Sequence, residues 1–153
     1  MKNLFKYGPL LFITVLMSSC LKANLEVLPV FSDAEITNFR LEYRWVEGEE
    51  AYGKLHVVQL PTKNTIDSET NTIISVITLP AASASFPESE RSKVSLQNVV
   101  GYADLSTAAS MHPIGDAPVL GKPGDFSKDN LQYEVVAADG QTKKVWKLTL
   151  SGL

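Results

Sequence analysis

The sequence predicts an all-β fold in which the strands form a two-sheet sandwich. Several segments alternate apolar and polar residues with a period of two, as strands with one buried face do. Clusters of turn-forming residues separate these segments. No stretch has a convincing helical period, and residues 104–111 are long enough for only one or two helical turns. Two arrangements are possible, a sandwich and a barrel. Most strands are expected to have one solvent-exposed face, which favours the sandwich.

A hairpin is expected near the start of the fold. Residues 36–45 alternate, and residues 54–60 resume the alternation after an acidic turn that contains Gly48. One face of the first strand is apolar and the other is charged. The apolar face consists of Phe39, Leu41, Tyr43 and Trp45, and the charged face of Arg40, Glu42 and Arg44.

The middle of the chain is less regular. Residues 61–71 are polar and are predicted to be a loop, whereas residues 72–79 form a nearly continuous β-branched run typical of a strand buried on both faces. Another strand is expected over residues 94–102, broken by Gly101. Residues 110–125 contain three prolines and three glycines, a density that predicts a long loop.

The C-terminal segment predicts a second hairpin. Two alternating runs flank Asp139-Gly140, a dipeptide that favours a type I′ turn with positive φ at both central residues. The apolar positions are Tyr133, Val135 and Ala137 before the turn, and Trp146, Leu148 and Leu150 after it. Trp45 and Trp146 both lie on apolar strand faces, so both are predicted to pack in the core.

The first 19 residues have the layout of a secretory signal. Lys2 and Lys6 precede an apolar stretch over residues 9–17. This stretch is too short to span a bilayer, which needs about 20 apolar residues. Small residues, Ser18 and Ser19, then precede the single cysteine of the chain, Cys20.

Residues 16–20, Leu-Met-Ser-Ser-Cys, resemble the lipobox of bacterial lipoproteins, although Met17 stands where that pattern prefers Leu. The resemblance implies cleavage before Cys20 and a lipid anchor on its sulfur. The alternative is an ordinary signal peptide followed by a free cysteine, which would be an oxidation liability in an exported protein. The predicted organisation is a signal peptide (1–19), a lipidated cysteine with a short tether (20–26) and one domain (27–153).

The net charge and the residues after Cys20 limit the expected partners and location. Without its signal peptide the chain has 134 residues, 12 of them basic and 17 acidic, so its net charge is −5. Nucleic acid is therefore not an expected partner, because its binding depends on Lys and Arg. Residues 21–26 lack the acidic run that marks surface export in some Bacteroidetes lipoproteins. The expected location is the outer membrane, and its face stays open with a preference for the periplasmic side.

The C-terminal segment 126–150 looks like the closing hairpin of Ig-like domains in Bacteroidetes cell-envelope proteins. It contains Phe-Ser before a strand, then Ala-Ala-Asp-Gly and the alternating Lys-Val-Trp-Lys-Leu. Together with residues 36–45 and 73–80, the layout is similar to lipoproteins with the uncharacterised domain DUF5018. The resemblance implies an Ig-like β-sandwich of about seven strands on a lipid anchor, and it implies no reaction.

No residue pattern predicts catalysis, so the protein is not expected to be an enzyme. His56 and His112 lack neighbours at metal-ligand spacing, and no serine has a nucleophile context. The paired acidic residues fall within turns, unlike the carboxylates of glycosidases. Asp116, Asp125 and Asp129 lack the dense spacing of a calcium loop. No metal or cofactor is predicted.

The predicted function is that of a membrane-anchored, non-catalytic module that binds a glycan or an envelope protein through its loops. The alternative is a structural or assembly subunit whose sheet edge pairs with another chain. Candidate ligand-binding residues are Tyr52, Tyr102, Phe126 and His112, three aromatic residues near turns and one histidine. The long loop over residues 111–125 is either the binding site or only a connector between sheets.

Overall fold

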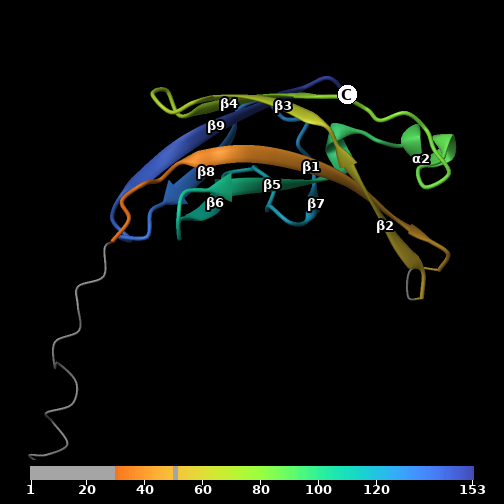
Figure 1. Cartoon of the computed structure of the whole chain (residues 1–153), viewed down its shortest axis with the longest axis horizontal. Coiled ribbons are helices and arrows are strands. Elements are labelled where there is room, and N and C mark those ends of the chain that lie inside the picture. The colour runs from red at the N-terminus through yellow and green to blue at the C-terminus, as the bar shows by residue number, and fades with distance from the viewer. Residues whose placement is uncertain (1–29, 50–51) are drawn as a thin grey trace, which may run out of the picture.

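The computed structural model describes residues 30–49 and 52–153, and the predicted signal peptide, Cys20 and tether lie outside these residues. Strands dominate the described part, with one short helix and one 3₁₀ turn (Figure 1). The elements are β1 (Ile36–Glu47), β2 (Lys54–Leu60), β3 (Thr62–Asp67), β4 (Thr72–Ile77), α2 (Glu88–Arg91), η1 (Leu96–Asn98), β5 (Val99–Leu105), β6 (Ser110–Ile114), β7 (Pro123–Gly124), β8 (Leu131–Val136) and β9 (Lys143–Ser151).

The strands form two sheets, which confirms the predicted all-β sandwich. Sheet A has the order β2-β1-β5-β7, and sheet B has the order β3-β4-β9-β8-β6. All pairs are antiparallel except β4 and β9, which run parallel. The chain passes from sheet A to sheet B between β2 and β3, where only Pro61 separates the two strands.

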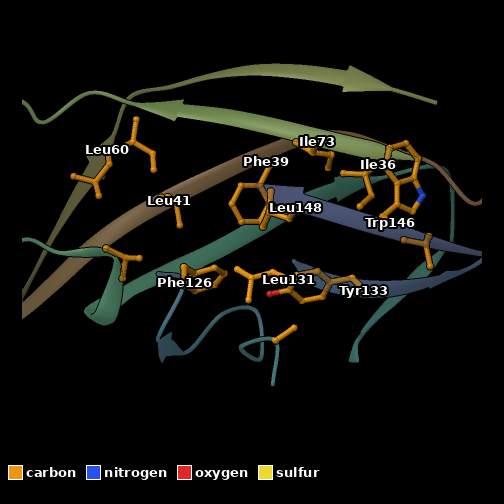
Figure 2. Packing of buried hydrophobic residues seen from close by; sticks show 14 of the residues in the cluster. Ile36, Phe39, Leu41, Leu60, Ile73, Phe126, Leu131, Tyr133, Trp146 and Leu148 are labelled. Carbon is orange, nitrogen blue, oxygen red and sulfur yellow. The ribbon is translucent and has the colours of Figure 1, made fainter. Parts of the chain in front are cut away.

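The core lies between the sheets and follows the period-two patterns of the sequence (Figure 2). Trp146 is 1% exposed, as predicted, and its Nε1 donates a hydrogen bond to the Ala34 carbonyl at 3.0 Å. Tyr133 is also buried, and this burial raises the pKa of its hydroxyl, which donates to the Pro118 carbonyl. The inner faces of β1, β4, β8 and β9 contribute Ile36, Phe39, Leu41, Ile73, Leu131, Tyr133, Val135, Trp146 and Leu148.

The first predicted hairpin is confirmed. β1 and β2 pair in register from Leu41 opposite Leu60 to Glu47 opposite Lys54. The end of this hairpin extends beyond the body of the sandwich, and the α2 segment lies near it (Figure 1). The described chain starts at the opposite end of β1, where the Asp139 N–H donates to the Phe31 carbonyl.

Two predictions for residues 61–79 are wrong. Residues 62–67 form strand β3 although they are polar, because Thr62, Asn64 and Ile66 turn inward while alternate residues face water. Asn64 donates to the Phe39 carbonyl and accepts from Ser75, which satisfies its amide inside the sandwich. Strand β4 is buried on one face only, and the outward residues Ile74 and Val76 are 50% and 45% exposed.

The second predicted hairpin is confirmed, but its turn is not of type I′. β8 and β9 pair from Leu131 opposite Leu148 to Val136 opposite Lys143. Gly140 has φ +68° and Asp139 does not have a positive φ. The Asp139 carboxylate instead accepts the N–H groups of Gln141 and Thr142, which stabilises a longer connection.

The predicted loop over residues 110–125 contains regular structure at both ends. Residues 110–114 form β6 and residues 123–124 form β7, so this segment links sheet B to sheet A. Gly121 donates to the Gly101 carbonyl, which ties the segment to β5. The helix considered over residues 104–111 does not form, and β5 starts at Val99, later than predicted.

Candidate functional site

A groove on the outer face of sheet A has a volume of about 510 Å³. It lies where β2 leaves β1 and crosses to the other sheet. Its volume is within the range of roughly 300–1,000 Å³ typical of small-molecule sites. The residues that line it come from β1, the β2–β3 crossing and β5; they are Arg40, Leu41, Glu42, Gln59, Leu60, Pro61, Thr62 and Tyr102.

The groove exists because the pairing of β1 with β2 ends at Leu41. The residues of β1 that precede Leu41 have no partner strand on that side in the described part of the chain. Pro61 has no N–H and a fixed φ, so the strand bends there instead of continuing the ladder. The Phe39 carbonyl, left without a strand partner, accepts hydrogen bonds from Thr62 Oγ1 at 3.1 Å and Asn64 Nδ2 at 2.6 Å. These bonds hold the crossing chain in place, so the wall of the groove is anchored to β1.

Each charged side chain that lines the groove forms an ion pair with a residue outside the lining. Arg40 contacts Asp104 at 2.6 Å, and Arg44 contacts Glu42 at 3.0 Å. The Arg44 guanidinium also lies 5.7 Å from the centre of the Tyr102 ring and donates a hydrogen bond to its hydroxyl. The two arginines and two carboxylates leave this surface without net charge.

A family comparison agrees with the fold. A sequence profile of the DUF5018-related family matches residues 36–149, from the first residue of β1 into β9. The chain belongs to the DUF5018-related family. The resemblance noted in the sequence is thereby confirmed, and the matched region includes all the residues that line the groove.

A solved structure supports the same assignment for this DUF5018-related chain. It is the crystal structure of a Bacteroides fragilis NCTC 9343 protein described as one predicted to be secreted. The two share 38% sequence identity with a TM-score of 0.73, over 82% of this chain and 100% of the other. The description of that protein agrees with the export predicted from residues 1–19. Comparison with curated proteins finds no match.

The predicted surface residues of the DUF5018-related domain do not converge on one site. Tyr102 lies in the groove. Tyr52 is 92% exposed at the tip of the β1–β2 hairpin. His112 is exposed on β6 of the other sheet, where Ser110 Oγ lies 3.4 Å from its Nε2. Tyr102 is therefore the candidate that the structure places beside a cavity with other polar side chains.

Phe126 is not a surface residue, which corrects its assignment as a candidate contact. It is 1% exposed, and its ring lies 6.3 Å from that of Phe39. Gly101 permits this packing, because a Cβ there would lie 2.6 Å from Phe126 Cζ. The proline- and glycine-rich segment thus folds back over sheet A and buries the ring that follows it.

Arg40, Glu42 and Gln59 line the groove, and none of them was a predicted site residue. The alternation that put Arg40 and Glu42 on the polar face of a strand was visible, but a polar face is usually only solvated. Their significance depends on Tyr102, which is about 60 residues away and reaches this face because β5 pairs with β1 opposite Arg40.

An aromatic cluster stabilises the protruding hairpin on its inner face. Trp45 is half-buried and stacks on His56 at 4.8 Å and on Tyr43 at 5.8 Å between ring centres. Phe86, from the segment before α2, packs against Trp45 at 5.8 Å. Burial, and then the nearby Glu90 carboxylate, raise the pKa of Tyr43. These contacts occupy the Trp45 ring, so its main role is packing.

Residues 30–49 and 52–153 contain no group of three or more His, Cys, Asp or Glu that could hold a metal ion. Asp116 contacts Lys128 at 3.2 Å, and Asp125 accepts hydrogen bonds from Ser127. In the same part of the chain, no helix is long and apolar enough to span a membrane.

Proposed function

We propose that this protein is a lipid-anchored binding module of the cell envelope, and that the groove beside Tyr102 holds a glycan without catalysing a reaction. The observation that carries the proposal is the convergence of hydrogen-bonding side chains and an aromatic ring in a cavity of about 510 Å³. Arg40 and Gln59 provide donors, and Glu42, Gln59 and the Thr62 hydroxyl oxygen provide acceptors. Sugar hydroxyls act as both donors and acceptors, so they suit such a mixed surface.

The pairing of charges supports a neutral ligand and a non-catalytic role. Arg40 in the groove faces Asp104, and Arg44 beside the groove faces Glu42, so an anionic sugar finds no unpaired arginine there. The same pairing commits both carboxylates to ion pairs, whereas glycoside hydrolysis needs a free carboxylic acid and a second carboxylate across the ligand. The groove therefore suits retention of a neutral saccharide.

The predicted anchor suits this placement of the groove. The described chain begins at the end of the sandwich opposite the hairpin tip (Figure 1). β1 has 12 residues and spans roughly 40 Å at about 3.3 Å per residue. A lipid on Cys20 would hold the sandwich by the start of β1, so the groove, at the middle of β1, would stand clear of the bilayer.

A panel of neutral oligosaccharides, with titration calorimetry of any that bind, tests the glycan proposal. Tyr102→Ala and Arg40→Ala should each weaken binding at least about tenfold, which corresponds to about 1.4 kcal/mol. Tyr52→Ala is the matched control, because it removes an aromatic ring that lies outside the groove. Equal affinity for all variants of unchanged stability would exclude the groove as the binding site.

The second candidate function, a structural or assembly subunit, is favoured by a different feature. Strand β2 is an edge of sheet A and exposes Leu55 and Val57 at 57% and 47%. Such an edge is suited to pairing with another strand. The two functions are compatible, because the groove faces outward from the sheet while the edge points along its plane.

A further inference from the structure

The four edge strands of the described sandwich differ in how they are protected from pairing. β7 has only two residues, and β6 contains Pro113. β3 carries the exposed charges of Lys63 and Asp67. Short length, proline and charge all discourage pairing with another chain. β2 has seven residues without proline or a register shift, and its only charged residue is Lys54 at the start.

The free hydrogen-bonding groups of β2 follow from the register. The Phe39 carbonyl points toward the crossing chain, so the odd-numbered residues of β1 from Phe39 onward direct their main-chain groups to the β2 side. The even-numbered residues of β2 opposite them are bonded to β1. The N–H and C=O groups of Leu55, Val57 and Gln59 therefore point outward at the edge.

The same parity holds on the other side of β1, which checks the assignment. Even-numbered residues of β1 bond to β5. Gly101 lies opposite Leu41, an odd-numbered residue, so the main-chain N–H and C=O of Gly101 should point away from β1. The Gly101 carbonyl does accept a hydrogen bond from Gly121, on the far side of β5. The edge groups of β2 are thus assigned by a pattern that two independent contacts support.

The exposed side chains beside this edge are apolar. Leu55 and Val57 alternate with inward residues, and Val46 lies directly opposite Leu55 on β1 with 43% of its surface exposed. An unprotected edge with an apolar row is an aggregation hazard unless it has a defined partner.

We propose that the partner is a second copy of this chain, with the two β2 strands paired antiparallel about a two-fold axis at Val57. Val57 then faces its own counterpart, and Leu55 faces Gln59 of the other copy. These facing pairs each exchange two main-chain hydrogen bonds, about six in all. The two four-stranded sheets become one continuous sheet through an isologous interface.

Charge is compatible with this register. Lys54 of each copy faces Leu60 of the other, so no like charges meet across the interface. The hairpin end with Glu47 and Glu49 extends past Leu60 of the other copy, toward the chain that carries the exposed Lys63.

The interface is small, so the dimer is a reversible one. Pairing along seven residues belongs to the class below about 1,200 Å², which is typical of transient association. Copies anchored in one membrane would meet at a higher local concentration. The pairing uses the main-chain groups of Gln59, whereas its side chain lines the groove.

Cysteine cross-linking tests the register directly. In the chain from residue 20 with Cys20→Ser, Val57→Cys supplies the only thiol. Facing residues of a hydrogen-bonded antiparallel pair have Cα atoms about 5.5 Å apart, within the roughly 4.4–6.8 Å that a disulfide needs. In the control Leu55→Cys, the two thiols belong to residues four positions out of register, roughly 13 Å apart.

We expect Val57→Cys to form an intermolecular disulfide at least about tenfold faster than Leu55→Cys, although Leu55 is the more exposed residue. Equal rates, or faster linkage of Leu55→Cys, would contradict the register and overturn the proposal.

Sedimentation velocity supplies a second test. The Cys20→Ser chain should shift from monomer to dimer as its concentration rises, and Val57→Pro, which removes an outward N–H only, should stay monomeric. A Cys20→Ser chain that stays monomeric at all concentrations, or assembles beyond a dimer, would also refute the two-fold pairing.

Discussion

Replacement of Trp146 tests how much its buried side chain contributes to the stability of the core. The indole is 1% exposed, and burying an aromatic side chain removes about 150–250 Å² from water. At about 25 cal/mol per Å², this burial contributes about 4–6 kcal/mol, an upper bound because the unfolded chain is already partly collapsed. Trp146→Ala should therefore lower the free energy of unfolding by about 3–5 kcal/mol.

Trp146→Phe separates packing from hydrogen bonding. Phenylalanine keeps most of the ring but has no N–H, so the Ala34 carbonyl loses the donor that lies 3.0 Å away. Ala34 is 0% exposed, so water does not replace that bond in the closed fold. The expected loss is about 1–3 kcal/mol, the cost of one buried unsatisfied polar group.

Urea unfolding followed by circular dichroism measures both losses as shifts in the midpoint at a constant slope. Tyr52→Ala is the control, and it should change stability by less than about 0.5 kcal/mol because the ring is 92% exposed. A loss below about 1 kcal/mol for Trp146→Ala would refute the inference that this residue closes the core.

Three further predictions concern other parts of the chain. Gly101→Ala should cost about 1–3 kcal/mol in urea unfolding, because its Cβ would lie 2.6 Å from Phe126 Cζ; no loss would show that the ring has room to move. Thr142 donates to the Asp139 carboxylate and lowers its pKa, so this bond stabilises the fold above the ordinary pKa and is lost as pH falls through the lowered value. Melting temperature between about pH 5 and pH 2 should therefore fall less steeply in Asp139→Asn than in the wild type, and parallel curves would contradict this linkage. Cys20→Ser should abolish metabolic labelling with a fatty-acid analogue, and retained label would exclude the lipoprotein assignment.

The parts of the fold that the sequence predicted share strong local patterns. β1, β2, β8 and β9 alternate clearly, and turn residues lie between their pairs. β3 was missed because its inward positions include Thr62 and Asn64, whose burial is compensated by hydrogen bonds to β1 and β4. A local pattern does not show such long-range partners.

The candidate site was less predictable than the fold. Tyr102 was identified as an aromatic residue near a turn, but Arg40 and Gln59 acquire their place from the pairing of β5, β1 and β2. Phe126 was placed on the surface because prolines and glycines precede it, and the structure buries it against Gly101. In both cases the outcome depends on which strands are neighbours, a property of the whole chain.

The central claim is that the groove beside Tyr102 is a ligand site, and an amide chemical-shift titration tests it most directly. A neutral oligosaccharide selected from the binding panel is added to the isotope-labelled Cys20→Ser chain. The groove predicts that the largest shift changes fall on the amides of residues 40–42, 59, 60, 62 and 102, and that they vanish in Tyr102→Ala. Shift changes concentrated at the hairpin tip or on β6, and unaffected by Tyr102→Ala, would contradict the account.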